Sequence, residues 1–299
     1  MDVIQDIRAP DQFKVFTFSK YQKTSVKKEW LSCMLKENVE ASCYWTTELI
    51  CSGLFTELWE LILLFYAKHI HGGNPKIPAY LVMRFDQFKQ EAVTVNEIEL
   101  RNNMTVRKIM TEIVCVLCKS NKRNSYDMID IGKDVVIVKS KLMAPTIDYN
   151  KGFKPNDPKE LFIPMNELGY ALSSKNTRNA CYWIEWLLLF LHKHKCKAIE
   201  RSYHPKYTTD GIWIVWDTLY AYAPTPLAKK ILDSLLRLFT IVYAPTVKEK
   251  RRFLLYYAVS VCCETISMEC ELIQDKKLIE HSYEKCWIMY KDIRKHEVS

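Results

Sequence analysis

The sequence NACYWIEWLLLFL, residues Asn179–Leu191, shares the tripeptide Cys-Tyr-Trp with the earlier sequence EASCYWTTEL, residues Glu40–Leu49. In both copies an acid follows within an apolar run. The apolar residues recur at helical spacing, which predicts an α-helix at each copy. Cys is small and apolar, while Tyr and Trp bury large areas and carry one polar atom each. We interpret the two copies as equivalent core helices, one in each half of the chain. A repeated chemical site is the alternative.

Helical spacing extends through most of the chain. The 299 residues include only 7 glycines, and no Gly-rich phosphate-binding motif is present, which excludes the usual nucleotide-binding loops. The sequence therefore predicts a mainly α fold. We expect helices over residues 25–38, 40–52, 54–71, 77–90, 104–118, 164–172, 177–196, 210–222, 226–242, 246–265 and 275–295.

The best linker in the sequence is residues 144–158, which hold three prolines, one glycine and few large aliphatic residues. We predict two helical halves joined there, residues 1–145 and 146–299, which an old and eroded duplication would explain. The Val/Ile-rich run DVVIVKSKL has strand character. The predicted fold class therefore allows at most one short β element, near residues 134–142.

Composition indicates a folded chain, with 48% hydrophobic and 26% charged residues and a formal net charge of +8. The N-terminal sequence lacks the pattern of a secretory signal, and the most apolar runs are too short to span a bilayer. The 11 cysteines are odd in number and scattered among apolar residues. Buried free thiols in a reducing compartment fit this pattern best, so we expect a soluble intracellular protein without a membrane partner.

Several acids fall inside predicted apolar helices: Glu48, Glu57, Glu60, Glu185 and Asp217. Burial raises the pKa of a carboxyl group, as a general acid requires, so two of these acids could form an acid–base pair. Pairing with an arginine such as Arg201 would instead make each of them structural. No local signature marks a nucleophilic cysteine. We favour the structural interpretation and predict no catalytic residue.

Metal binding has two weak candidates. Cys115 and Cys118 form a C-x-x-C, but within an apolar helical run rather than on a turn. His192 and Cys196 are one helical turn apart in a cationic stretch that fits a helix C-terminus. We therefore predict neither a metal nor a cofactor. Further potential ligands near the C-terminus are Cys262, Cys263, Cys270, His281 and Cys286.

Clusters of cations occur near tyrosines such as Tyr126 and Tyr203, a combination that suits phosphate contact and base stacking. Solvated helix ends would explain the same clusters without a partner. The residues that we predict to contact nucleic acid are Lys119, Lys122, Arg123, Lys193, Lys195, Lys197, Lys248, Lys250, Arg251 and Arg252.

Seven segments between about Leu31 and Tyr220 together resemble a conserved, uncharacterised protein family of nucleocytoplasmic large DNA viruses, the giant and algal viruses. The resemblance implies a viral context in the cytoplasmic virus factory, the nucleus or the virion, and it transfers no catalytic residue. The segments are TTELICSG, ELWE, GNPKIPAYLVMRFDQF, ELRNN, DPKELFIPMNELGYAL, NACYWIEWLL and DGIWIVWD.

Three functional hypotheses follow. The first is a non-enzymatic helical adaptor that binds DNA, RNA or the viral replication and transcription machinery through basic helices. The second is a virion or assembly protein whose partners are capsid or other proteins, which predicts an exposed apolar patch. The third is an enzyme that uses Glu48, Glu185 and Asp217 or a thiol, and it requires a shared pocket. The first is favoured, and the sequence leaves the oligomeric state open.

Overall fold

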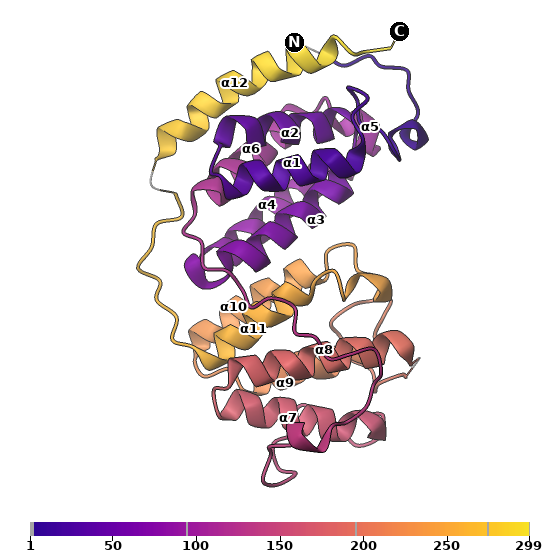
Figure 1. Ribbon diagram of the computed structural model, residues 1–299. Coiled ribbons are helices and arrows are strands. Elements are labelled where there is room, and N and C mark those ends of the chain that lie inside the picture. Colours follow the sequence, from indigo (N-terminus) through magenta and orange to yellow (C-terminus); the bar gives the residue numbers. More distant parts are fainter. Residues whose placement is uncertain (1–2, 94, 195, 274, 299) are drawn as a thin grey trace. The chain divides into compact units, whose positions relative to one another are not determined.

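The computed structural model describes residues 3–93, 95–194, 196–273 and 275–298, and this part of the chain is mainly α-helical (Figure 1). Twelve α-helices occur in it, joined by loops and short 3₁₀ or π turns, and it contains no β-strand. The mainly α fold class is thus confirmed. None of the described helices is long and apolar enough to cross a membrane.

Contacts divide the chain into two compact units. The first consists of residues 1–66, 80–121 and 269–299, and the second of residues 67–79 and 122–268. These units differ from the predicted halves in three places. The C-terminal helix joins the first unit, and residues 67–79 and 122–145 join the second. One boundary predicted at one linker divides the chain only once. It therefore misses that residues 269–299, at the C-terminus, belong to the first unit.

The first unit is built around helix α2 (Val39–Cys51). Four helices contact it: α1 (Lys23–Leu35), α3 (Phe55–Phe65), α6 (Met104–Lys119) and α12 (Lys276–Arg294). Two more helices, α4 (Ile77–Ala92) and α5 (Glu97–Leu100), precede α6 in the chain. Nearly all of α2 is buried because it is covered from several sides.

The second unit is built around helix α8 (Thr177–Lys193), which carries the second Cys-Tyr-Trp. Helices α7 (Phe162–Ser173), α9 (Ile212–Ala221) and α11 (Arg252–Cys263) contact it, and α10 (Pro226–Phe239) packs on α9 and α11. Trp183, Trp213 and Trp216 are fully buried in this unit. These rings supply much of its apolar core.

Five helix pairs recur in the two units. In the first unit α1 contacts α2, α3 and α6, and α2 also contacts α3 and α6. In the second unit α7 contacts α8, α9 and α11, and α8 also contacts α9 and α11. These five pairs correspond in chain order, whereas the packing of α10 on α9 and α11 has no equally close match in the first unit, to which helix α12 is an addition.

The turn before each Cys-Tyr-Trp helix is also the same. Glu37 and Lys175 adopt left-handed φ values of 56° and 58°. The next residue is an asparagine in both turns, and its N–H donates to a carbonyl of the preceding helix, at 3.1 Å for Asn38 and 2.9 Å for Asn176. This is the 6→1 bond that ends many helices. Both asparagines then cap the next helix, and the cysteine follows five residues later.

Asn38 provides a direct test of this turn. Its Oδ1 accepts a hydrogen bond of 3.0 Å from the N–H of Ala41, which satisfies one of the free donors at the start of α2. We expect Asn38→Ala to lower the free energy of unfolding by about 1 kcal/mol, the usual effect of losing such a cap. Urea denaturation measures this, and Asn38→Ser, which keeps an acceptor, should recover most of the loss. Equal losses for both variants would contradict the capping role.

The strand expected near residues 134–142 does not form. This segment contains bends and a 3₁₀ turn at Lys139–Lys141. The side chains of Val136 and Val138 are 60% and 46% exposed. A strand needs a partner for its backbone groups, and no strand occurs in the described residues for this one to pair with. The backbone is held by a side chain instead, because Trp186 Nε1 donates to the carbonyl of Val136 at 3.2 Å.

Candidate functional site

The acids considered for catalysis are held by partners inside their own unit. In the second unit Arg201 donates to both oxygens of buried Asp157, at 2.7 and 2.6 Å, and through Nε to Asp217 at 2.6 Å. Tyr203 donates to the other oxygen of Asp217 at 2.6 Å. Both oxygens of Asp217 are therefore occupied, an arrangement typical of a structural ion network.

Glu185 and Glu48 are also satisfied internally. Glu185 accepts from Arg252 at 2.7 Å and from Tyr256 at 2.8 Å. Burial raises the pKa of Glu185, and the two donors oppose that effect. Glu48 lies in the other unit and accepts from the N–H and hydroxyl of Ser19, both at 2.7 Å. These acids anchor neighbouring segments, which favours the structural interpretation.

The cations predicted to contact nucleic acid differ in their surroundings. Lys248 is buried and donates to Asp210 at 2.9 Å, and buried Arg251 donates to the carbonyl of Phe239 at 2.6 Å. Arg252 is held by Glu185, so only Lys250 of this cluster is exposed. Buried cations with internal acceptors are poorly placed to contact phosphate. The run KEKRR is thus mainly a structural element of the second unit.

The other predicted cations lie nearer to solvent. Arg123 is exposed and pairs with Glu264 at 2.6 Å, and exposed Lys193 lies 3.7 Å from Asp134. Exposed Lys119 belongs to the first unit and lies 4.0 Å from Glu37. Lys195 lies outside the described residues. Lys122 is half-buried and Lys197 is exposed.

Residues 122–144, named the strap here, form a loop in the second unit that is held by specific contacts. The carboxylate of buried Glu167 accepts from the N–H groups of Met143 and Ala144, at 2.8 and 3.1 Å. The N–H of Ile129 donates to Tyr256 Oη at 3.3 Å. Together with the bond from Trp186, these contacts fix the strap against α7, α8 and α11 without regular secondary structure.

A cleft of about 670 Å³ lies between the strap and the start of α8. It combines two tyrosine rings, two cations and several amide groups. Tyr126 is 44% exposed, and Lys141 Nζ lies 5.1 Å from the centre of the Tyr182 ring, a cation–π contact. Arg178 is exposed in the first turn of α8. The lining residues are Tyr126, Asp127, Met128, Ile129, Asp130, Ser140, Lys141, Met143, Asn176, Arg178, Asn179 and Tyr182.

One buried donor in the wall of this cleft lacks an acceptor. Asn179 Nδ2 is shielded from solvent and has no hydrogen-bond partner among the described residues. Burying an amide without a partner is unfavourable, and native proteins rarely do so. The positive end of the α8 dipole lies beside it, with Asn176 as the cap. The wall therefore lies in the positive field at the start of α8, whereas the Asn179 donor is closed to solvent in this structure. Asp130 uses its Oδ1 to accept from the N–H of Gly132 at 2.8 Å.

The strap also exposes apolar side chains to solvent. Five of them are more than 40% exposed: Met128, Val136, Val138, Leu142 and Met143. Isolated exposed apolar residues are common on folded proteins, but five within 16 residues of one loop are a concentrated apolar surface. This surface is the feature that a partner protein would contact.

The sequence placed Tyr126 beside a cation cluster but gave no reason to single out Lys141, Arg178 or Asn179. Lys141 lies far from the other two in the chain, and the three meet because the strap folds back over α8. The available signal was the Asn cap and Arg178 directly before the second Cys-Tyr-Trp, which places a cation in the first turn of a helix. Tyr182 itself was assigned to core packing, and its side chain is largely buried.

No group of three or more His, Cys, Asp or Glu in the described residues could hold a metal ion. All 11 cysteines are free thiols.

Comparisons with protein-family models, with curated proteins and with solved structures find no match to this chain.

Proposed function

We propose that this chain is a non-enzymatic helical protein that binds single-stranded DNA or RNA in the cleft between the strap and α8. The observation that supports the proposal is the combination of an exposed ring, two cations and a helix N-terminus in one cleft. Bases stack on aromatic rings, while cations and helix N-termini attract phosphates. The cleft volume also lies within the range of about 300–1,000 Å³ typical of ligand sites.

Tyr126 and Arg178 test this proposal directly. We expect Tyr126→Ala to weaken binding of a short oligothymidine or oligouridine by about 1–3 kcal/mol, because one base loses its stacking partner. Arg178→Glu should weaken binding and lower the slope of log affinity against log salt by about 0.7, the contribution of one phosphate contact to a single strand. Fluorescence anisotropy at several salt concentrations measures both effects.

Lys229→Glu is the matched control for Arg178→Glu, because Lys229 is an exposed cation on α10 of the same unit and does not line the cleft. It should leave both the affinity and the salt slope nearly unchanged. If Lys229→Glu and Arg178→Glu weaken binding equally, the attraction is general and the cleft is not the site. If wild-type protein shows no salt-dependent binding, the nucleic-acid function is wrong.

A second candidate function is that of an adaptor for protein partners, favoured by the exposed apolar side chains of the strap. It predicts that Met128→Asp and Val136→Asp abolish complex formation with a replication, transcription or capsid protein. The complex would resist salt, in contrast to a nucleic-acid complex. The viral context, and localisation to a virus factory, the nucleus or a virion, remain proposals that rest on sequence resemblance alone.

We also infer that the two units contain eroded copies of one four-helix module. The matching helix pairs, the matching turn and the equal spacing from asparagine to Cys-Tyr-Trp support this inference. The copies have diverged at the acids, since Glu48 follows Cys43 by five residues and Glu185 follows Cys181 by four. The shared tripeptide would then preserve packing rather than a repeated chemical site.

A further inference from the structure

Three cysteine thiols meet inside the first unit, each from a different helix. Cys43 lies on α2, Cys115 on α6 and Cys286 on α12. Cys43 hydrogen-bonds to both of the others, and all three side chains are buried. A single buried thiol behaves as a small apolar group, whereas two thiols in contact can form a disulfide without a large movement of the backbone.

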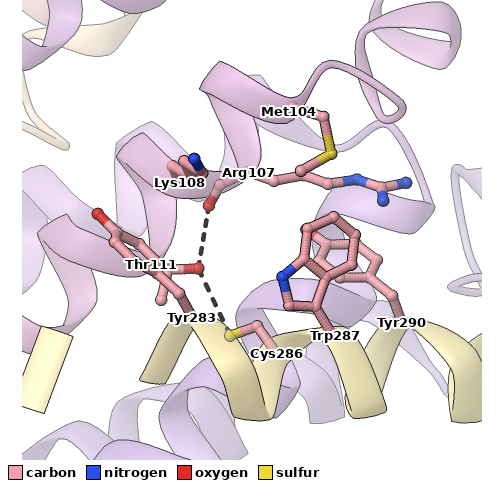
Figure 2. Close-up of a pocket in the computed structure, with 8 residues that line it drawn as sticks. All are labelled: Met104, Arg107, Lys108, Thr111, Tyr283, Cys286, Trp287 and Tyr290. Carbon is pink, nitrogen blue, oxygen red and sulfur yellow. Dashed lines mark hydrogen bonds between the residues drawn. The ribbon is translucent and has the colours of Figure 1, made fainter. Parts of the chain in front are cut away.

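The surroundings distinguish Cys43 from the other two thiols. Hydrogen bonds to its neighbours, together with burial, raise the pKa of Cys43. A hydrogen bond with Cys43 lowers the pKa of Cys115 and that of Cys286, and Thr111 Oγ1 lies 3.5 Å from the sulfur of Cys286 (Figure 2). The thiolate is the reactive form of cysteine. Cys286 therefore ionises before Cys43, which keeps its proton.

Each member of this pair lines a cavity. Cys286 lines a cavity of about 20 Å³ between α6 and α12, next to Thr111 and Trp287 (Figure 2). That volume accommodates about one water-sized molecule. Cys43 lines a second cavity of about 280 Å³ together with His281 and Ser282. Cys115 lines neither of these two cavities.

We propose that Cys43 and Cys286 form a dithiol site that hydrogen peroxide oxidises to a disulfide joining α2 to α12. The Cys286 thiolate attacks one peroxide oxygen, the O–O bond breaks, and the departing hydroxide takes a proton to become water. The resulting Cys286 sulfenic acid is attacked by Cys43 sulfur, the S–O bond breaks, and the proton of Cys43 leaves with the hydroxide as a second water. Two thiols lose two electrons, and one peroxide is reduced to two waters.

The disulfide would change the behaviour of α12. This helix contacts α2 and α6, and residues 264–273 before it are non-helical, so it is not continuous with another helix (Figure 1). A covalent bond to α2 prevents α12 from separating in a local opening of the unit. We expect hydrogen exchange in α12 to slow by at least about tenfold on oxidation, because the opened state is removed.

The test treats the folded protein with hydrogen peroxide, alkylates the remaining thiols and maps disulfides by mass spectrometry. The expected product has lost two hydrogens and contains a Cys43–Cys286 peptide pair. Cys115→Ala should still form it. Cys43→Ala should stop at a Cys286 sulfenic acid, which dimedone traps. Cys181→Ala, at the matching position of the second unit, should leave the reaction unchanged.

Three results would overturn the proposal: no disulfide in the folded wild-type protein, a disulfide between a different pair, or oxidation that proceeds only as fast as the whole protein unfolds. Wild-type protein alone yields each of these results, so the test does not depend on the folding of a variant. The site belongs to the first unit, and the proposal does not rely on nucleic-acid binding by the second.

Discussion

Replacing Arg201 by methionine is expected to lower the free energy of unfolding by about 3–5 kcal/mol, the usual effect of removing one partner of a buried ion pair. The guanidinium is 2% exposed and Asp157 is fully buried, so the carboxylate would be left charged without its cation. Methionine has a similar length and is apolar, so the packing of the side chain is largely kept. The loss therefore reports on charge and hydrogen bonding.

The position of Arg201 explains why the effect should be large. Its guanidinium joins Asp157, in the loop before α7, to Asp217 on α9, and also donates to the carbonyls of Gly152 and Ile199. Burial alone would raise the pKa of Asp157, but the hydrogen bonds from Arg201 and two backbone N–H groups lower it overall. Arg201 thus joins the non-helical segments that contain Gly152, Asp157 and Ile199 to helix α9.

Urea denaturation measures this loss, and Arg123→Met is the matched control. Arg123 belongs to the same unit and also pairs with a carboxylate at 2.6 Å, but its side chain is 59% exposed. An exposed pair contributes about 0–1 kcal/mol, so the control should remain close to wild type. If both variants lower the free energy of unfolding equally, the effect of Arg201→Met does not come from the burial of its ion pairs.

Helical class and the two Cys-Tyr-Trp helices were predictable from the sequence because they depend on local periodicity. The expected helix over residues 40–52 corresponds to α2 at Val39–Cys51. The helix expected over residues 177–196 ends at Lys193, three residues early. The helix expected over residues 54–71 instead ends at Phe65, followed by the π turn Tyr66–Ile70. Nothing in the apolar spacing of that segment marks the change.

The cation clusters show where local patterns stop being informative. The run KEKRR contains four cations in five residues, which suggests a basic surface. Asp210 and Glu185, which accept from Lys248 and Arg252, lie about 40 and 70 residues away in the sequence. Burial of a cation depends on such distant partners, so charge density along the chain does not reveal it. The cleft was missed for the same reason, since the strap is positioned by the distant Glu167 and Trp186.

His71 should make the stability of the second unit depend on pH. The ring is 4% exposed and lies between the carbonyl of Ala67 and the hydroxyl of Ser260, both at 3.0 Å from its nitrogens. Burial lowers the pKa of His71 to about 4, while the Ala67 carbonyl and Glu264 partly oppose the shift and Arg123 adds to it. The neutral ring is thus the form that the folded protein favours.

The unfolded chain binds a proton at His71 near pH 6.5, the ordinary histidine value, whereas the folded chain does so only near pH 4. The stabilising contribution is complete above pH 6.5 and is lost as the pH falls from 6.5 to 4. A shift of this size corresponds to about 3 kcal/mol over the whole interval. As the pH falls, this one group should lower the free energy of unfolding with a maximal slope of about 1.4 kcal/mol per pH unit.

Comparison of wild type with His71→Asn isolates this contribution from that of other titrating groups, including Glu185, whose raised pKa acts with the opposite sign. Asparagine tolerates the left-handed φ of 47° at this position. The variant should be less stable at pH 7, because the ring leaves Tyr257 and Ser260, but its stability should change less between pH 6.5 and 4. His281→Asn, at an exposed position on α12, should keep the wild-type dependence. Parallel pH profiles for wild type and His71→Asn would show that the buried ring is not the source.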